Sequence, residues 1–254
     1  MAKDLAQKVL AYRWIIFWIM AAAYVVVYFH RLSPAVVALD LQTAFQTSGG
    51  FMGLLASAYF YPYAVMQFPA GLLSDSLGPR KTVTIFLVIA ACGSFAFGMT
   101  QSVEGAVLAR VFVGLGVSMV FIPAMKVLSQ WFRASEFAYM VGIMNAMGGI
   151  GALTAATPLA FMTNHIGWRM SFELIGLITL IMAILVWIIV RNRPSDMGWP
   201  SIAQIDNAEG GPAVTTQVIG LLEGAKLVVT EKYFWPLAAW FFLVPGIFFG
   251  FGGL

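Results

Sequence analysis

The stretch Gly71-Leu72-Leu73-Ser74-Asp75-Ser76-Leu77-Gly78-Pro79-Arg80-Lys81 forms a short polar connection between two long apolar blocks. The block before it covers residues 50–73, and the block after it covers residues 82–99. A helix that crosses a lipid bilayer needs about 20 mostly apolar residues. Both blocks are close to that length, so the stretch predicts a tight turn between two membrane-spanning helices.

The composition of the whole chain agrees with a membrane protein. Hydrophobic residues make up 61% of the 254 positions and charged residues 10%, whereas soluble domains carry about 25% charge. Only helices and closed barrels satisfy the backbone in lipid, and barrel strands alternate over about 10 residues. The long unbroken apolar blocks therefore predict an all-α, polytopic membrane protein.

Seven apolar blocks are long enough to be spans. They cover residues 14–38, 50–73, 82–99, 105–128, 137–162, 170–190 and 233–254. We therefore expect a six-helix bundle in residues 1–191 and a loop in residues 192–231, with a short surface helix near residues 218–229. The seventh span would fill residues 232–254.

The distribution of basic residues predicts the orientation of the chain. With a cytoplasmic N-terminus, eleven of the fourteen Lys and Arg residues fall on inside segments and only Arg169 falls outside. Arg31 and Arg110 lie within spans. The first span continues well past the length of a signal-peptide core, so we expect it to stay uncleaved. Cys92 is the only cysteine, which excludes an intrachain disulfide, and we expect it to be a small buried side chain.

The turn at residues 71–81 resembles the signature G-x-x-x-D-[RK]-x-G-[RK]-[RK] of the major facilitator superfamily, although Ser76 and Pro79 replace basic residues. The resemblance implies that this loop controls the opening of a transporter. Gly71 would allow close helix packing and Gly78 a tight turn. Asp75 would accept hydrogen bonds from Arg80 or from other loop cations. The conformational-switch residues implied in this way are Gly71, Asp75, Gly78, Arg80 and Lys81.

Further matches to the family occur in the expected order. Arg110-Val111-Phe112-Val113-Gly114-Leu115-Gly116 resembles R-x-x-x-G-x-G on the fourth helix, where Arg110, Gly114 and Gly116 would have a structural role. Gly167-Trp168-Arg169 and Arg191-Asn192-Arg193-Pro194 resemble the opening and exit of the sixth helix. The family has two six-helix halves, each made of two inverted three-helix repeats. The resemblance therefore implies a truncated carrier: the first half plus the seventh helix.

Arg31 is the foremost candidate for substrate binding. A charge at mid-membrane costs at least about 2.5–3.5 kcal/mol, so it usually has a partner or a function. The pattern Tyr28-Phe29-His30-Arg31 resembles the Y-x-x-R of organic-anion and organophosphate transporters, where the Arg binds a carboxylate or phosphate. A snorkelling Arg at the outer interface is the alternative. Tyr28 shares the helical face of Arg31 and would line the same cavity.

Other polar residues could complete the site. Tyr59, Tyr63 and Gln67 share one face of the second span, as either a cavity stripe or aromatic packing. Lys126 could attract an anion or anchor its helix at the inner surface. His30 could carry a coupling proton or be a satisfied structural residue.

Together these features predict a secondary active transporter of a small organic anion, coupled to protons or working by anion exchange. The alternative is a truncated half-carrier without transport activity, acting as a binding or scaffold module. We expect the lipid bilayer to surround the chain. We expect no catalytic residues, metal, cofactor or nucleic-acid partner. A complete carrier would be monomeric, and a true half could pair.

Overall fold

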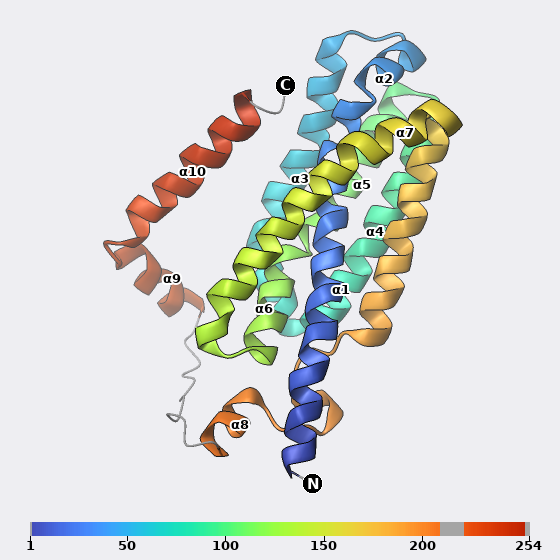
Figure 1. The fold of residues 1–254 in the computed structure, drawn as a ribbon. Coiled ribbons are helices and arrows are strands. Elements are labelled where there is room, and N and C mark those ends of the chain that lie inside the picture. Colours follow the sequence, from blue (N-terminus) through green and yellow to red (C-terminus); the bar gives the residue numbers. More distant parts are fainter. Residues whose placement is uncertain (1, 209–220, 252–254) are drawn as a thin grey trace. The chain divides into compact units, whose positions relative to one another are not determined.

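The computed structural model describes residues 2–208 and 221–251, and within them it contains helices and no strands. The chain divides into two compact units, Met1–Gly211 and Pro212–Leu254. Figure 1 shows the helices of each unit. The all-α fold predicted from the apolar blocks is confirmed.

Seven α-helices, among the described residues, form the main body of the first unit. They are α1 (Ala2–Val36), α2 (Ala38–Phe45), α3 (Gly49–Ser76), α4 (Pro79–Met99), α5 (Val103–Ser118), α6 (Phe121–Trp131) and α7 (Ala134–Ile189). Two features of this arrangement were not predicted from the apolar blocks. The short helix α2 was not anticipated, and the predicted span 105–128 is interrupted at Met119 and Val120, between α5 and α6.

The 56-residue helix α7 consists of two helices that meet at Gly167. Gly167 has φ +78°, a conformation that costs glycine little because it has no Cβ. The predicted spans 137–162 and 170–190 lie on either side of this turn. Residues 2–189 therefore contain six long helical segments (Figure 1). These are α1, α3, α4, the pair α5–α6 and the two parts of α7.

Four stretches of the described chain are long and apolar enough to cross a membrane. They are Asp4–Val36, Pro79–Met99, Val103–Trp131 and Ala134–Ile189. Helix α3 has 28 residues but is not among them, because its tyrosines, prolines and Gln67 lower its hydropathy. The predicted span 50–73 therefore has the length of a span but a lower mean hydropathy than those four stretches.

The helices of this unit pack around two clusters of buried apolar residues. Helix α4 packs on α5 and α7, α1 packs on α7, and α3 packs on α5. Gly114 and Gly116 of α5 allow close approach to α3 and α4. An added Cβ at Gly114 would clash with the Tyr59 carbonyl oxygen, and one at Gly116 would clash with the Ala90 backbone nitrogen. A Cβ at Gly71 would meet no described atom within 4 Å, so the close packing expected at Gly71 is not seen in this bundle.

The first part of the predicted loop 192–231 is folded onto the bundle. A short 3-10 helix (Pro194–Met197) leads to α8 (Ile202–Ala208), whose Ile202 and Ile205 are buried in the core. The Asp206 carboxylate accepts a hydrogen bond of 2.7 Å from Arg133 Nε. Residues up to Ala208 therefore belong structurally with the bundle.

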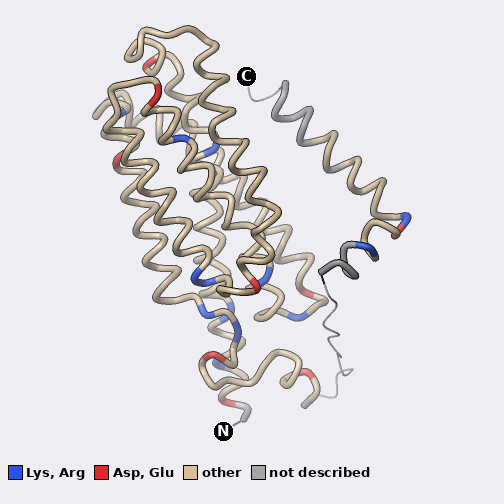
Figure 2. The backbone as a smooth tube through the Cα atoms, turned by 180° about the vertical axis from the view of Figure 1, so that it is seen from behind, with Lys and Arg blue, Asp and Glu red and all other residues tan. Residues whose placement is uncertain are grey.

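The second unit contains α9 (Leu221–Thr230) and α10 (Phe234–Phe251). Helix α9 overlaps the predicted surface helix 218–229, of which residues 218–220 lie outside the described part. The seventh predicted span corresponds to α10 as far as residue 251. In the first unit, Lys and Arg gather toward the end of the bundle where the N-terminus lies (Figure 2). Cys92 is exposed on α4, so its predicted burial is wrong.

Candidate functional site

Arg31 lies near the C-terminal end of α1 and is surrounded by aromatic side chains. Its guanidinium carbon is 4.7 Å from the centre of the Tyr28 ring and 5.1 Å from that of Tyr63, with Phe60 at 5.9 Å. A cation over a ring face at these distances is attracted by the ring quadrupole. The structure thus brings Tyr28 of α1 and Tyr63 of α3 together around Arg31. We call Arg31, Tyr28, Tyr59 and Tyr63 the arginine–tyrosine cluster.

Tyr59 extends this cluster toward a second cation. The Tyr59 and Tyr63 rings, four residues apart on α3, stack with centres 5.9 Å apart and an interplanar angle of 15°. On α5, the guanidinium carbon of Arg110 lies 4.7 Å from the centre of the Tyr59 ring. Tyr59 therefore contacts both Tyr63 and Arg110. The Tyr59 side chain is completely buried.

Gln67 continues the same face of α3, one turn beyond Tyr63. Its Nε2 donates to the Tyr63 carbonyl oxygen at 3.2 Å and to the Ser118 carbonyl oxygen of α5 at 3.5 Å. The second distance is at the long limit of a hydrogen bond. Gln67 is half-buried, so its amide helps join α3 to α5 beside the cluster.

His30 precedes Arg31 and points to a different helix. Its ring is fully buried, and Nε2 lies 2.8 Å from Thr179 Oγ1 of α7. The Thr179 hydroxyl donates to the Ile175 carbonyl oxygen at 2.7 Å, so it can accept from His30 Nε2–H. This pairing places the proton of the neutral ring on Nε2. Arg31 therefore faces the tyrosines of α3, while His30 is anchored to α7.

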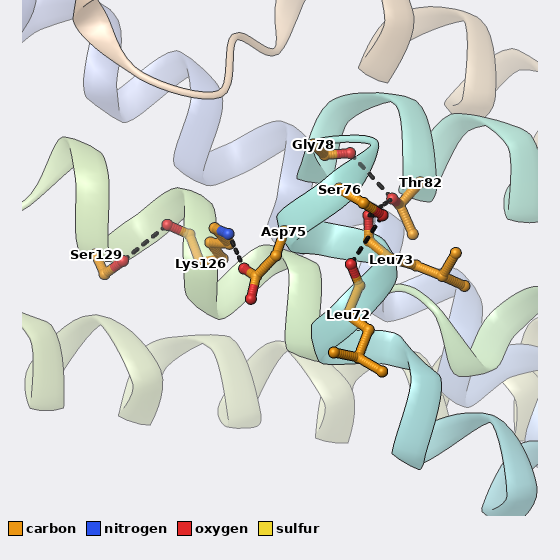
Figure 3. Close-up of polar contacts among 8 residues, drawn as sticks. All are labelled: Leu72, Leu73, Asp75, Ser76, Gly78, Thr82, Lys126 and Ser129. Carbon is orange, nitrogen blue, oxygen red and sulfur yellow. Dashed lines mark hydrogen bonds and ion pairs between the residues drawn. The ribbon is translucent and has the colours of Figure 1, made fainter. Parts of the chain in front are cut away.

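The α3–α4 turn carries a separate charged group (Figure 3). Asp75 forms an ion pair with Lys126 of α6. Arg80, one of the partners that the sequence suggested for Asp75, instead donates from Nε to the Trp187 carbonyl oxygen at 2.8 Å and lies over the Trp187 ring. Lys126 thus joins the turn and is not brought to Arg31.

Hydrogen bonds fix the backbone of this turn. Gly78 has φ +83°, and an added Cβ there would lie 2.7 Å from Asn192 Nδ2. Asn192 Oδ1 accepts from the Arg80 backbone N–H at 2.9 Å, and Thr82 Oγ1 lies 3.0 Å from the Gly78 carbonyl oxygen. These contacts explain why a glycine stands at position 78. Lys81, the other predicted switch cation, is exposed.

A hollow of about 350 Å³ lies beside the turn. It is lined by polar residues of the turn, by Lys126 and Gln130 of α6, and by Asn192, Arg193 and Asp196. None of the arginine–tyrosine cluster lines it. The predicted site residues therefore form two groups: the cluster with Gln67, and the turn with Lys126.

The described residues contain no group of three or more His, Cys, Asp or Glu side chains that could hold a metal ion. The sequence did not reveal the contacts of Asn192 or of Thr179, because both contacts link segments more than 100 residues apart. The signals in the sequence are that Asn192 stands in the stretch resembling the exit of the sixth helix and that Thr179 is a polar residue within a predicted span.

The sequence model described as Major Facilitator Superfamily matches residues 10–254. The hexuronate transporter of Escherichia coli K12 is 26% identical over 91% of this chain and 54% of its own length. A probable sulfoacetate transporter of Cupriavidus necator is 25% identical over 72% of this chain and 42% of its own length.

Among solved structures, an inward-facing, unoccupied bacterial homologue of the human lysosomal transporter Spinster has a TM-score of 0.69. It shares 18% identity and covers 90% of this chain and 51% of its own chain, which shows a common fold. The chain spans about half the length of the curated relatives it matches.

Proposed function

The chain belongs to the major facilitator superfamily, and from this premise we propose that it contributes the anion-binding half of a secondary active transporter. The chain is accordingly an integral membrane protein. The proposed carrier moves a small organic anion by alternating access, in which two halves rock about a site near the middle of the membrane.

The arginine–tyrosine cluster is the observation that carries this proposal. A guanidinium offers a planar fork of donors that matches a carboxylate, sulfonate or phosphate. Three aromatic faces hold the Arg31 guanidinium, and the tyrosine hydroxyls and the Gln67 amide add polar groups for the rest of the ligand. The two relatives described above transport, by their names, a hexuronate and sulfoacetate. Both compounds bear a carboxylate.

Residues of the α3–α4 turn would control opening in this proposal. The ion pair between Asp75 and Lys126 joins α3 to α6, and Arg80 joins α4 to the end of α7. Gly71 and Lys81 complete the set implied by the family signature. Lys126 would also attract anions toward the site when its pair with Asp75 opens.

We propose coupling to protons as the driving force, with His30 as the candidate carrier. The His30 ring is enclosed between α1 and α7, so a proton would reach it only when those helices separate. Uptake of D-glucuronate into proteoliposomes that hold the full-length carrier tests this. An inward proton gradient should stimulate uptake into empty vesicles. Uptake that instead needs an anion inside the vesicle would mean exchange.

The proposed orientation places the N-terminus and the α3–α4 turn in the cytoplasm. The Lys and Arg residues at that end of the bundle (Figure 2) agree with the preference of basic residues for the cytoplasmic side. A complete carrier of this kind would act as a monomer.

A thermal-shift experiment on the full-length carrier tests the binding function. A ligand that binds only the folded state raises its stability, so D-glucuronate should raise the melting temperature of the wild type. Arg31→Ala should abolish the shift without lowering the melting temperature of the ligand-free protein by more than a few degrees. A shift that persists in Arg31→Ala would overturn the assignment of Arg31.

A further inference from the structure

A proline interrupts the backbone hydrogen bonds of α1 beside the proposed binding residue. In an α-helix the N–H of residue i bonds to the carbonyl of residue i−4. Pro34 lies inside α1 and has no N–H. The carbonyl oxygen of His30, the residue before Arg31, therefore lacks its backbone donor.

A side chain from another helix supplies a donor to this carbonyl. Arg110 Nη1 of α5 donates to the His30 carbonyl oxygen at 3.0 Å, and Ser33 Oγ adds a longer contact of 3.3 Å. Arg110 is only 2% exposed. Buried backbone carbonyls are almost always hydrogen-bonded, and a charged donor makes a stronger bond than a neutral one. The Arg110 bond thus takes the place of the missing backbone bond.

The surroundings of Arg110 connect this bond to the arginine–tyrosine cluster. The same guanidinium lies over the Tyr59 ring, which stacks on Tyr63, and Tyr63 contacts Arg31. The ring of His30 is held by Thr179. His30 is therefore fixed through its main chain by α5 and through its side chain by α7, one residue before Arg31.

We propose that Arg110 is a positioning residue that replaces the donor missing at Pro34 and thereby fixes the direction in which Arg31 projects. The proposal rests on the anion-binding function of Arg31. Arg110 acts through α1 and makes no contact with the anion, because the buried Tyr59 ring lies against its guanidinium.

A simple electrostatic role for Arg110 gives different expectations. If its charge merely attracted the anion, restoring a backbone donor at position 34 would not compensate for its loss. If it positions Arg31 through the His30 carbonyl, Pro34→Ala would compensate, because the alanine introduced there has the N–H that completes the helix. Rescue by a substitution that adds no charge therefore separates the two roles.

The experiment measures the Kd of D-glucuronate for the full-length carrier by isothermal titration calorimetry. Arg110→Met should raise the Kd about tenfold or more, in line with the loss of a charged hydrogen bond. Pro34→Ala should leave the Kd within about threefold of wild type, and the double variant should recover most of the loss. Arg110→Lys keeps a donor and should lie between wild type and Arg110→Met.

Pro69→Ala is the matched control. Pro69 is also a proline inside a helix, in α3, and the carbonyl four residues earlier belongs to Val65. Combined with Arg110→Met, Pro69→Ala should not restore affinity. A double variant Arg110→Met/Pro34→Ala that binds as weakly as Arg110→Met would overturn the proposal, as would equal rescue by Pro69→Ala.

Hydrogen–deuterium exchange without ligand gives a second readout. The peptide covering residues 28–36 should exchange faster in Arg110→Met and return toward wild type in Arg110→Met/Pro34→Ala. This comparison holds even if the wild type binds no D-glucuronate, an outcome that would reject the binding function alone. Unchanged exchange in Arg110→Met would reject the positioning role.

Discussion

The arginine–tyrosine cluster and the α3–α4 turn both present a cation that the sequence assigns to the substrate. Arg31 is held by the faces of Tyr28, Phe60 and Tyr63. Lys126 instead forms an ion pair with Asp75, whose side chain is 67% exposed. The first cation lies among aromatic rings, and the second is already neutralised by a carboxylate at the end of the bundle.

This difference indicates separate roles for Arg31 and Lys126, which the sequence alone could not distinguish. Aromatic faces attract a guanidinium without cancelling its positive charge, so that charge remains to attract an anion. An anion that bound Lys126 would have to displace Asp75. We therefore expect Arg31 to determine affinity, and the Asp75–Lys126 pair to affect the rate at which the carrier changes conformation.

The largest expected effect comes from comparing Arg31→Ala with Lys126→Ala. Loss of Arg31 should raise the Kd of D-glucuronate about a hundredfold, since it removes a bidentate charged contact. Loss of Lys126 should change the Kd less than about threefold, because its charge is already paired. Isothermal titration calorimetry on the full-length carrier measures both values.

Arg31→Lys sharpens this comparison. It keeps the charge and removes the planar fork, so its affinity should fall between those of wild type and Arg31→Ala. If Lys126→Ala weakened binding as much as Arg31→Ala does, the division of tasks between the two regions would be wrong.

The sequence predicted contacts within one helix better than contacts between helices. Spacings of three and four residues placed Tyr28 beside Arg31 and Tyr59 beside Tyr63, and the structure has both contacts. These predictions succeed because helical geometry fixes which residues share a face. The pairing of Asp75 with Lys126 depends instead on how α3 packs against α6, which no local pattern encodes.

Irregular backbone was harder to predict for the same reason. The break at Met119 and Val120 lies in sequence that is apolar enough to continue a span. Helix α2 lies in the polar link between the first two predicted spans. Helix α8 lies in a loop rich in proline and glycine, and it is held by burial of Ile202 and Ile205 in the core. Tertiary packing, rather than local propensity, decides these elements.

An intermediate effect on stability is expected from Gly114→Ala. The added methyl would clash with the Tyr59 backbone, so α3 and α5 must separate beneath the arginine–tyrosine cluster. Overpacking of this kind costs about 1–3 kcal/mol. The melting temperature of the full-length carrier should fall by several degrees, with a weaker Kd for D-glucuronate.

Gly71→Ala at the α3–α4 turn is the matched control for Gly114→Ala. Its methyl group meets no described atom within 4 Å, and alanine favours the helix over glycine by about 1 kcal/mol. Its melting temperature should therefore stay level or rise slightly. Equal destabilisation by the two substitutions would show that the spacing at Tyr59 has no special importance.

The smallest expected effect on binding comes from exchanging the charges of the Asp75–Lys126 pair. Asp75→Lys or Lys126→Asp alone places two like charges side by side. Repulsion between them then replaces the attraction of the present ion pair. Exposed pairs contribute about 0–1 kcal/mol, so the Kd of D-glucuronate should stay within about threefold of wild type. The uptake rate in proteoliposomes should drop in each single variant and recover in the double variant. Recovery of rate without a change in Kd would assign the pair to the conformational change, whereas parallel changes in both would place Lys126 with Arg31 in anion binding.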